Sequence, residues 1–267
     1  MITNENATRA CPVCNSEGYT AERISRDPWR VARCGFCSFV YLQNPPALEQ
    51  LMAEFSWDKT VETESVRRKA EQPVLQWFDR KTRWRLHMFE RPESRKFLEK
   101  AIGSGNVLDL GCGDGRHAMA LSEAYTPFGV EIAPVLAEAA DKAFAGRGGH
   151  CVSADSLSGI GTFEDGFFDG AILNSYLEHD TRPLEVLEAL QPKMKPGAPV
   201  IVKVPNYGSW NAAVMGRGWC GVRLPDHVNY FTWDSLADMG GRAGYSVQGV
   251  PSANLPTNDN MWAIMQA

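Results

Sequence analysis

Four cysteines near the start of the chain form two C-x-x-C pairs, Cys11 with Cys14 and Cys34 with Cys37. A gap of two residues lets both thiolates of a pair face one metal ion, and two such pairs complete a tetrahedron. A pair of disulfides is disfavoured in a reducing compartment, and a redox C-x-x-C leaves the second pair unexplained. Because four thiolates close the coordination sphere, the spacing predicts a structural zinc ion.

A second candidate site is the segment 107–116, VLDLGCGDGR, in which a short apolar run is followed by three glycines two residues apart. The run is typical of a buried parallel strand, and glycines let the backbone approach a ligand closely because no Cβ intervenes. The N–H groups that open the next helix, expected near Arg116, would face the same ligand. Arg116 also occupies the third glycine position of the dinucleotide pattern G-x-G-x-x-G. The segment predicts a nucleotide-like ligand, with an NAD site or a turn without ligand as alternatives.

Two further acids follow stretches that read as strands. Glu131 ends the stretch 127–131, where a carboxylate can accept both hydroxyls of a ribose. Asp155 and Ser156 follow the stretch 150–154. Carboxyl ends of parallel strands are the usual ligand edge of such a sheet, so these side chains are expected near the glycine turn.

The string DLGCGDG resembles the first motif of class I S-adenosylmethionine (SAM) methyltransferases, and the order of elements matches that family over residues 100–267. In the family, an Asp at the place of Asp109 helps hold the methionine end of SAM, and an acid at the place of Asp155 meets the adenine amino group. The resemblance implies SAM as cofactor. The SAM-binding residues that it implies are Asp109, Gly111, Cys112, Gly113, Gly115, Glu131, Ile132, Asp155, Ser156 and Asn174.

The remaining patterns complete an α/β sheet. Further strands are predicted at 168–174, at 199–204, from 243–245 onward and, antiparallel, at 260–266. Helices are predicted over 92–102, from 134 to about 144, over 177–179 with 184–194, and from an N-cap at Thr232 to about 240. The predicted fold is a Rossmann-like seven-stranded methyltransferase sheet with an N-terminal zinc ribbon and a helical cap. The expected parts are a zinc ribbon over 1–44, a helical linker and cap over 45–100, and a SAM-binding core over 101–267.

The ribbon should contain a small hairpin over 19–33, and a module this short needs its metal to fold. The whole chain has 267 residues, 44% of them hydrophobic, and a net charge of −5. The negative charge disfavours a nucleic-acid enzyme, whose affinity depends on phosphate contacts. No signal peptide and no run of membrane-spanning length is apparent, so a cytoplasmic protein with no membrane partner is expected. The oligomeric state is left open.

Two histidines are candidate catalytic bases. A hydroxyl acceptor must lose a proton during methyl transfer, and histidine is the natural base near neutral pH. His227 and His179 are the candidates, with a structural hydrogen-bonding role as the alternative for each. The pattern H-x-x-x-F-T-x-x-S-L from His227 and the L-E-H at 177–179 resemble the ubiquinone O-methyltransferase-like branch. Some members of that branch place another acid where Ser175 stands here, so an active-site metal built from that acid is not expected.

The acceptor rim is expected from three segments: the basic and aromatic residues 80–85, the end of the fourth strand near Tyr176 and His179, and the loop 207–227. Aromatic rings and cations suit a small polar acceptor. The predicted function is therefore SAM-dependent O-methylation of a sugar-like or natural-product hydroxyl. Two other classes stay open: a ribosomal RNA base methyltransferase, because a zinc ribbon on this core resembles one such family, and a non-catalytic SAM-binding interaction module.

Overall fold

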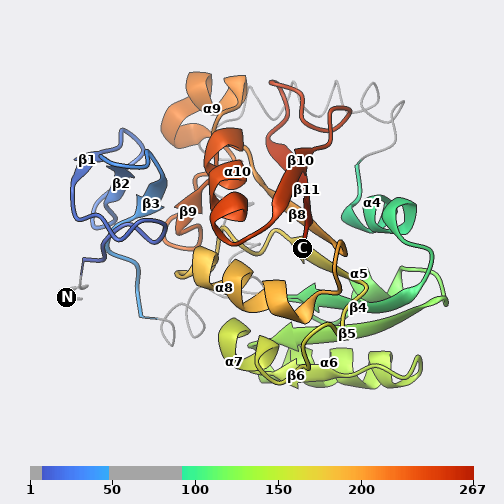
Figure 1. Ribbon diagram of the computed structural model, residues 1–267. Coiled ribbons are helices and arrows are strands. Elements are labelled where there is room, and N and C mark those ends of the chain that lie inside the picture. Colours follow the sequence, from blue (N-terminus) through green and yellow to red (C-terminus); the bar gives the residue numbers. More distant parts are fainter. Residues whose placement is uncertain (1–7, 48–91) are drawn as a thin grey trace, which may run out of the picture.

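The computed structural model describes residues 8–47 and 92–267, which form two β-sheets with helices around the larger one (Figure 1). In spatial order, the strands of the larger sheet are β10 (Ser246–Gly249), β11 (Asn260–Gln266), β8 (Pro199–Pro205), β7 (Gly170–Asn174), β4 (Gly105–Leu110), β5 (Tyr125–Glu131) and β6 (Cys151–Ser153). The five strands from β8 to β6 are parallel, whereas β11 runs antiparallel to both of its neighbours. This arrangement confirms the predicted α/β fold and its antiparallel strand at 260–266.

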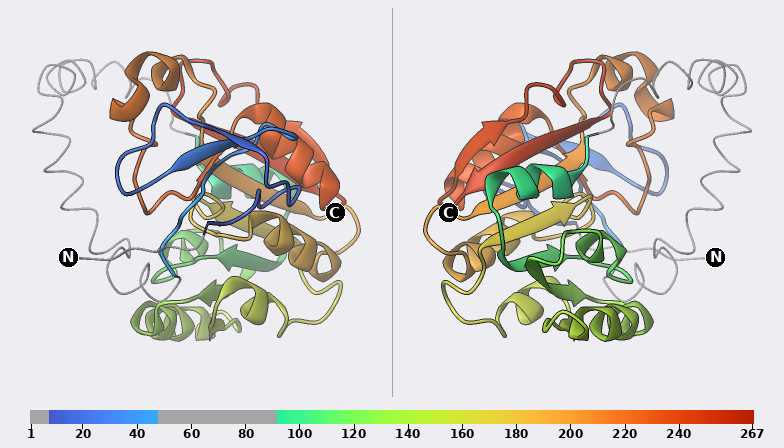
Figure 2. Two further views of the ribbon diagram at one scale, coloured as in Figure 1. Left: turned by 90° about the vertical axis from the view of Figure 1, so that its left-hand side faces the viewer. Right: turned by 90° about the vertical axis from the view of Figure 1, so that its right-hand side faces the viewer.

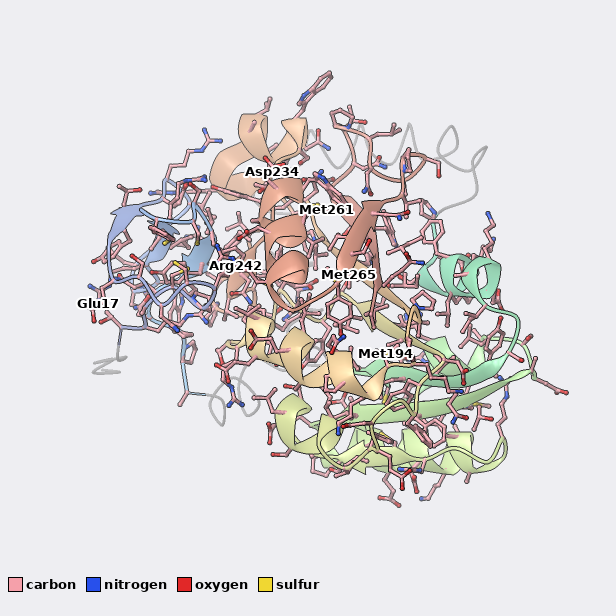
Figure 3. The ribbon with its side chains drawn as sticks, viewed as in Figure 1. Glu17, Met194, Asp234, Arg242, Met261 and Met265 are labelled. Atoms are coloured by element: carbon pink, nitrogen blue, oxygen red, sulfur yellow. The ribbon has the colours of Figure 1, made fainter. Side chains whose placement is uncertain are left out.

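Helices cover both faces of the larger sheet. They are α4 (Ser94–Ala101), α5 (Arg116–Met119), α6 (Pro134–Ala145), α7 (Ser156–Ile160), α8 (Pro183–Leu190) and α10 (Trp233–Arg242). A further helix, α9 (Trp210–Met215), instead packs through Ala212 with residues of the smaller sheet. Successive residues of a strand point to opposite faces. Val107 of β4 packs with Leu98 of α4, whereas Leu108 packs in the main core with residues of α7, α8 and α10. Met261 and Met265 of β11 belong to the same main core and lie beside α10 (Figure 3).

The small sheet joins N-terminal strands to a strand from the later part of the chain. It consists of β1 (Tyr19–Ala21), β2 (Val31–Cys34), β3 (Val40–Leu42) and β9 (Asn229–Tyr230), in that order. Strands β1 and β2 form the hairpin that was expected within 19–33. Strand β9 pairs antiparallel with β3, and the rings of Phe39 and Phe231 meet edge to face at 5.4 Å. The small sheet lies on the side of the molecule opposite α4 (Figure 2).

The predicted starts of two helices agree with the structure. Helix α6 begins at the predicted Pro134, and Thr232 caps α10 by accepting a hydrogen bond from the Ser235 N–H. The helix predicted to start near Arg116 is α5, which begins at Arg116 and is four residues long.

Two other expectations were wrong in detail. Residues 177–179 lie in a turn and not in a helix. The helix predicted over 184–194 ends at Leu190 and continues as the short 3₁₀ helix η1 (Gln191–Lys193), because Pro192 has no N–H to continue an α-helix. Of the predicted cap, residues 48–91 lie outside the described residues. No helix in the described ranges is long and apolar enough to cross a membrane.

Candidate functional site

The three glycines of the loop 111–115, here called the glycine loop, all have positive φ angles, of 71°, 57° and 82°. A Cβ at Gly111 would lie 2.5 Å from Cδ2 of Tyr176, and one at Gly115 would lie 2.8 Å from the Phe144 ring. A Cβ at Gly113 would meet no described atom within 4 Å. Gly111 and Gly115 thus allow close packing, while Gly113 borders open space where a ligand can approach the backbone.

Asp109 is an unusual buried acid at the end of β4. Its side chain is 2% exposed, and its Oδ2 atom has no hydrogen-bond partner among the described residues. Burial, with a contribution from the nearby Glu131, raises the pKa of Asp109 to about 7 against the opposing effect of the Ala118 N–H. A buried carboxylate oxygen without a hydrogen-bond partner is costly. Asp109 therefore suits a ligand that brings a cation or hydrogen-bond donors.

Glu131, at the end of β5, is fixed beside the same loop. Its Oε2 accepts a hydrogen bond from the Gly113 N–H at 2.9 Å, and its Oε1 accepts one from the Ala133 N–H at 2.9 Å. A carboxylate has about four acceptor sites, so both oxygens can still accept further bonds from hydroxyl groups. Ile132, half-buried, directly follows this carboxylate.

Asp155 and Ser156 follow β6, at the same edge of the sheet. Asp155 caps α7 by accepting from the Ser158 N–H. The side chain of Ser158, and then this N–H, lower the pKa of Asp155 despite partial burial, so the carboxylate is ionised. The Ser156 hydroxyl donates to Oδ2 of Asp180 at 2.8 Å, and the Tyr176 hydroxyl donates to the same oxygen at 2.7 Å. This shared acceptor holds the Tyr176 ring against Gly111.

Asn174 and Cys112 complete the residues that the sequence predicted here. Asn174 ends β7 and accepts a hydrogen bond from the Ser94 hydroxyl at 2.9 Å. Cys112 lies within the glycine loop, with its Sγ 3.5 Å from Sγ of Cys151 on β6. The structure therefore gathers the predicted SAM-binding residues at the carboxyl ends of β4, β5, β6 and β7, the usual ligand edge of a parallel sheet.

His179 forms a histidine–carboxylate pair next to this edge. Its Nδ1 lies 2.9 Å from Oδ1 of Asp226, and its backbone N–H bonds to the carbonyl of Tyr176. Burial lowers the pKa of His179, but Asp226 outweighs it, so the net shift is upward. The Nδ1 atom is thus held by the carboxylate, which leaves Nε2 to act on a ligand. The sequence analysis missed Asp226, since nothing local marks a partner 47 residues away.

His227 is a different kind of histidine. Its side chain is buried, and its Nδ1 bonds to the Gly221 carbonyl at 2.9 Å. Burial and the neighbouring His179 lower its pKa well below the ordinary value, so the ring stays neutral. The two histidine rings meet edge to face at 4.8 Å. The structure thus brings the two candidates together but favours His179 as the stronger base.

Charged residues surround the histidine pair. Glu178 is 1% exposed, burial raises its pKa, and its Oε2 has no hydrogen-bond partner in the described ranges. Its carboxylate and one ring nitrogen of each histidine lie within 4.8 Å of one another. Lys203 of β8 is largely buried, which lowers its pKa, and it interacts electrostatically with Glu178. Arg223 contacts Asp226 at 2.8 Å. Lys203 and Arg223 thus place positive charge beside these acids, but at Glu178 the cost of burial still outweighs it.

The loop 207–227 was predicted to contribute side chains to the acceptor rim, and its two tryptophans differ in whether they could do so. Trp210 is 64% exposed, but Trp219 is 2% exposed and donates a hydrogen bond from Nε1 to Asp259 at 2.7 Å. Trp219 packs with residues of the small sheet, so it is not an open wall for an acceptor. The basic segment 80–85 lies outside the described residues.

The four N-terminal cysteines form a compact cluster. All four Sγ atoms lie within 4.8 Å of one another, and two of the sulfur pairs are 3.5 Å apart. The N–H groups of Phe36 and Cys37 point to Sγ of Cys34 at 3.4 and 3.5 Å. These contacts outweigh desolvation and bring the pKa of Cys34 down to about 7. Arg242 of α10, labelled in Figure 3, forms an ion pair with Asp238 at 2.8 Å and interacts more weakly with Cys14 and Cys37 of this cluster.

Comparison with known proteins identifies the family. A family model described as a methyltransferase domain matches residues 76–250, more than half of the chain. The 2-heptyl-1-hydroxyquinolin-4(1H)-one methyltransferase of Mycobacteroides abscessus is 36% identical over 121 residues, which are 43% of this chain and 52% of that protein. The chain thus spans about half the length of this curated relative.

Solved structures support the same fold. A SAM-dependent methyltransferase from Archaeoglobus fulgidus superposes with a TM-score of 0.54 at 18% identity, covering 73% of this chain and 100% of that one. A SAM-dependent methyltransferase from Thermotoga maritima, described as a possible histamine N-methyltransferase, gives 0.51 at 19% identity over 72% and 96% of the two chains. At these identities the matches show a shared fold. With the family model matching more than half of its length, the chain belongs to the family of methyltransferase domains.

Proposed function

We propose that this protein transfers the methyl group of SAM to a hydroxyl of a small polar acceptor, such as a sugar-like molecule or a natural product. The observation that carries the proposal is the His179–Asp226 pair in the turn after β7. Tyr176 of the same turn packs against Gly111 of the glycine loop, so the candidate base lies beside the candidate cofactor site. A positioned base next to an electrophile is the arrangement that hydroxyl methylation needs.

Three acids would hold the cofactor. The unpaired, buried carboxylate of Asp109 would meet the ammonium group of the methionine part, which brings the charge that this site lacks. Glu131 would accept the ribose hydroxyls while it keeps its bond to Gly113. Asp155, ionised and held by the Ser158 N–H, would accept from the adenine amino group. The bound SAM supplies an electrophilic methyl group on its sulfonium.

The acceptor side would remove the hydroxyl proton. His179 would take this proton at Nε2, while Asp226 holds its Nδ1 and stabilises the imidazolium that forms. His227, kept neutral by burial, would fix the position of His179 through ring contact. Two features support a small acceptor. The curated relative is named for a hydroxyquinolone, and the turn at 177–179 carries the L-E-H of the ubiquinone O-methyltransferase-like branch.

The cysteine cluster is proposed to hold one structural zinc ion through Cys11, Cys14, Cys34 and Cys37. The donor set fits, since four sulfurs converge and N–H groups point to Sγ of Cys34. Bound zinc would cross-link β2 and the N-terminal loop. With four thiolates there is no open position for a substrate, so its role would be to stabilise the small sheet.

Incubation with SAM labelled on its methyl group and a cell extract tests the proposed function. Label recovered in small metabolites is the expected result. Label in RNA would instead favour the ribosomal RNA alternative. Protein that binds SAM but transfers no label would favour a non-catalytic SAM-binding module, and either of these outcomes would overturn the proposal.

Replacing His179 with Gln is expected to lower kcat by about 10² to 10⁴, the usual contribution of a general base, with little change in SAM affinity. The base must be neutral, so the rate rises with pH through the pKa of His179, which Asp226 holds above its usual value. Asp226→Asn should therefore move this rise to lower pH, even though Glu178, Arg223 and His227 still act on the same ring.

His227→Ala is the matched comparison. It should lower turnover less than His179→Gln, and both deficits should shrink at high pH as the acceptor ionises by itself. The opposite ranking, with near-normal turnover for His179→Gln, would assign the base role to His227.

A further inference from the structure

Cys112 and Cys151 can contact each other because the residue between them, Gly129, has no side chain. Their sulfurs lie 3.5 Å apart, above Gly129 of β5. A Cβ at Gly129 would stand 2.6 Å from Sγ of Cys112 and 3.2 Å from Sγ of Cys151. Because Gly129 has no Cβ, the two sulfurs reach each other across β5.

The register of the sheet puts this pair beside the candidate cofactor site. Gly129 is the direct neighbour of Asp109 on β4 and of Cys151 on β6, and such neighbours point to the same face. The sulfur of Cys112 therefore lies on the same face as the Asp109 carboxylate. Cys112 also directly precedes Gly113, whose N–H holds the Glu131 carboxylate. A displacement of Cys112 would therefore disturb both Asp109 and Glu131, two of the acids that are proposed to bind SAM.

We propose that Cys112 and Cys151 are a modification site: a peroxide converts them into a disulfide, and the disulfide form binds SAM weakly. The first part rests on the two sulfurs alone, and the second part rests on the proposed SAM site. The oxidant is a peroxide, and a small thiol or dithiol reverses the reaction.

The reaction balances in two steps. The Cys151 thiolate, half-buried and so the more accessible of the two, attacks one peroxide oxygen. An S–O bond forms, the O–O bond breaks, and hydroxide leaves and takes up a proton as water. Cys112, 6% exposed, then attacks the sulfenic acid sulfur. The S–S bond forms, the S–O bond breaks, and the thiol proton of Cys112 leaves with the hydroxide. Two thiols and one hydrogen peroxide give one disulfide and two waters.

Disulfide formation must move the glycine loop. An S–S bond is about 2.05 Å long, so the sulfurs must approach by roughly 1.5 Å from their present separation. The loop is held on one side by Tyr176 against Gly111 and on the other by Phe144 against Gly115. Cys112 and Gly113 are therefore the residues that move when the disulfide forms. Their displacement draws the Gly113 N–H away from the Glu131 carboxylate. Loss of a hydrogen bond that orients a charged group is expected to weaken SAM binding by about tenfold or more.

The test compares the full-length wild-type protein with Cys151→Ser, each reduced and then treated with hydrogen peroxide. Trypsin should release residues 101–116 and 148–193 as one cross-linked species from oxidised wild type. SAM affinity, measured by calorimetry, should fall about tenfold or more on oxidation and return with dithiothreitol. The Cys151→Ser protein should match reduced wild type before and after peroxide. Zinc release, followed with a metal-binding dye, reports damage to the four N-terminal cysteines, which both proteins share.

Three results would overturn the proposal. Oxidised wild type without the cross-linked species would show that the disulfide does not form. The cross-linked species with unchanged SAM affinity would remove its effect on binding. An equal loss of affinity in Cys151→Ser would trace the loss to other cysteines. Reduced protein that binds no SAM would instead refute the proposed function, and the cross-linked species would still decide whether the disulfide forms.

Discussion

Replacement of Asp109 with Asn is expected to abolish SAM binding while it stabilises the protein that has no SAM bound. Asp109 is 2% exposed and its Oδ2 has no partner in the described part of the chain, so the charge is a cost to the folded state without a ligand. With SAM bound, the same carboxylate would pair with the ammonium group. Removing one partner of such a buried pair costs about 3–5 kcal/mol, which is a loss of affinity of at least a hundredfold.

The stability effect has a defined pH dependence. The folded-state pKa of Asp109 is about 7, above the value of about 4 for an unfolded Asp. Between these values the folded state binds more protons than the unfolded state, so the contribution of Asp109 to stability falls as pH rises from about 4 to about 7. Asp109→Asn removes this loss. The free energy of unfolding of Asp109→Asn should therefore equal that of wild type near pH 4. Above pH 7 it should exceed that of wild type by about 1–3 kcal/mol, and the melting temperatures should follow the same order.

Asp114→Asn is the matched control. Asp114 lies in the same glycine loop, but it is only half-buried and forms an ion pair with the exposed Arg116. Its replacement should change neither SAM affinity nor the pH profile by a measurable amount. Gly113→Val should also abolish SAM binding, because a side chain at a φ of 57° is strained and enters the open space above the loop. Full SAM affinity in both Asp109→Asn and Gly113→Val would remove the cofactor assignment.

Loss of the zinc ion that we propose for the four-cysteine cluster is expected to stop turnover and not merely to unfold the N-terminal residues. Strand β3 pairs with β9, which follows His227 by two residues. Arg9, two residues before Cys11, donates hydrogen bonds to two carbonyls: that of Thr181, two residues after His179, and that of Val228, directly after His227. A structural zinc site of this type contributes on the order of 10 kcal/mol to folding. Without it, β3 would no longer hold the segment that carries Asp226 and His227.

Binding of SAM should be less affected by loss of the zinc ion. The residues that are proposed to bind SAM come from β4 to β7, which do not belong to the small sheet. Cys37→Ser should therefore lower kcat by about a hundredfold or more, while SAM affinity changes by only a few-fold. Protein purified without chelator should contain one zinc per chain by elemental analysis. Cys220→Ser, outside the cysteine cluster, should keep both zinc and turnover. Absence of zinc in such a preparation, or full turnover of zinc-free Cys37→Ser protein, would contradict this account.

Local chemistry determined much of what the sequence predicted. The apolar runs of β4 and β8 need cover on both sides, and the glycine loop follows β4 directly, so strand and turn are encoded within ten residues. The capping of α10 by Thr232 depends on the next three residues alone. The two C-x-x-C pairs place two sulfurs each by their own spacing. All of these are contacts between near neighbours, whose geometry the backbone fixes.

Only the tertiary structure determines which side chains contact one another on the proposed acceptor side of the site. His179 gains its partner from Asp226, β9 joins a sheet whose first strand begins 210 residues earlier along the chain, and Trp219 is buried against that sheet. Cys112 and Cys151 meet only because Gly129 lies between them. No pattern within a strand or a helix encodes such pairs, because they form only when packing of the apolar core brings distant segments together. The sequence therefore determined the sheet and the glycine loop, and the packing decided which side chains face one another there.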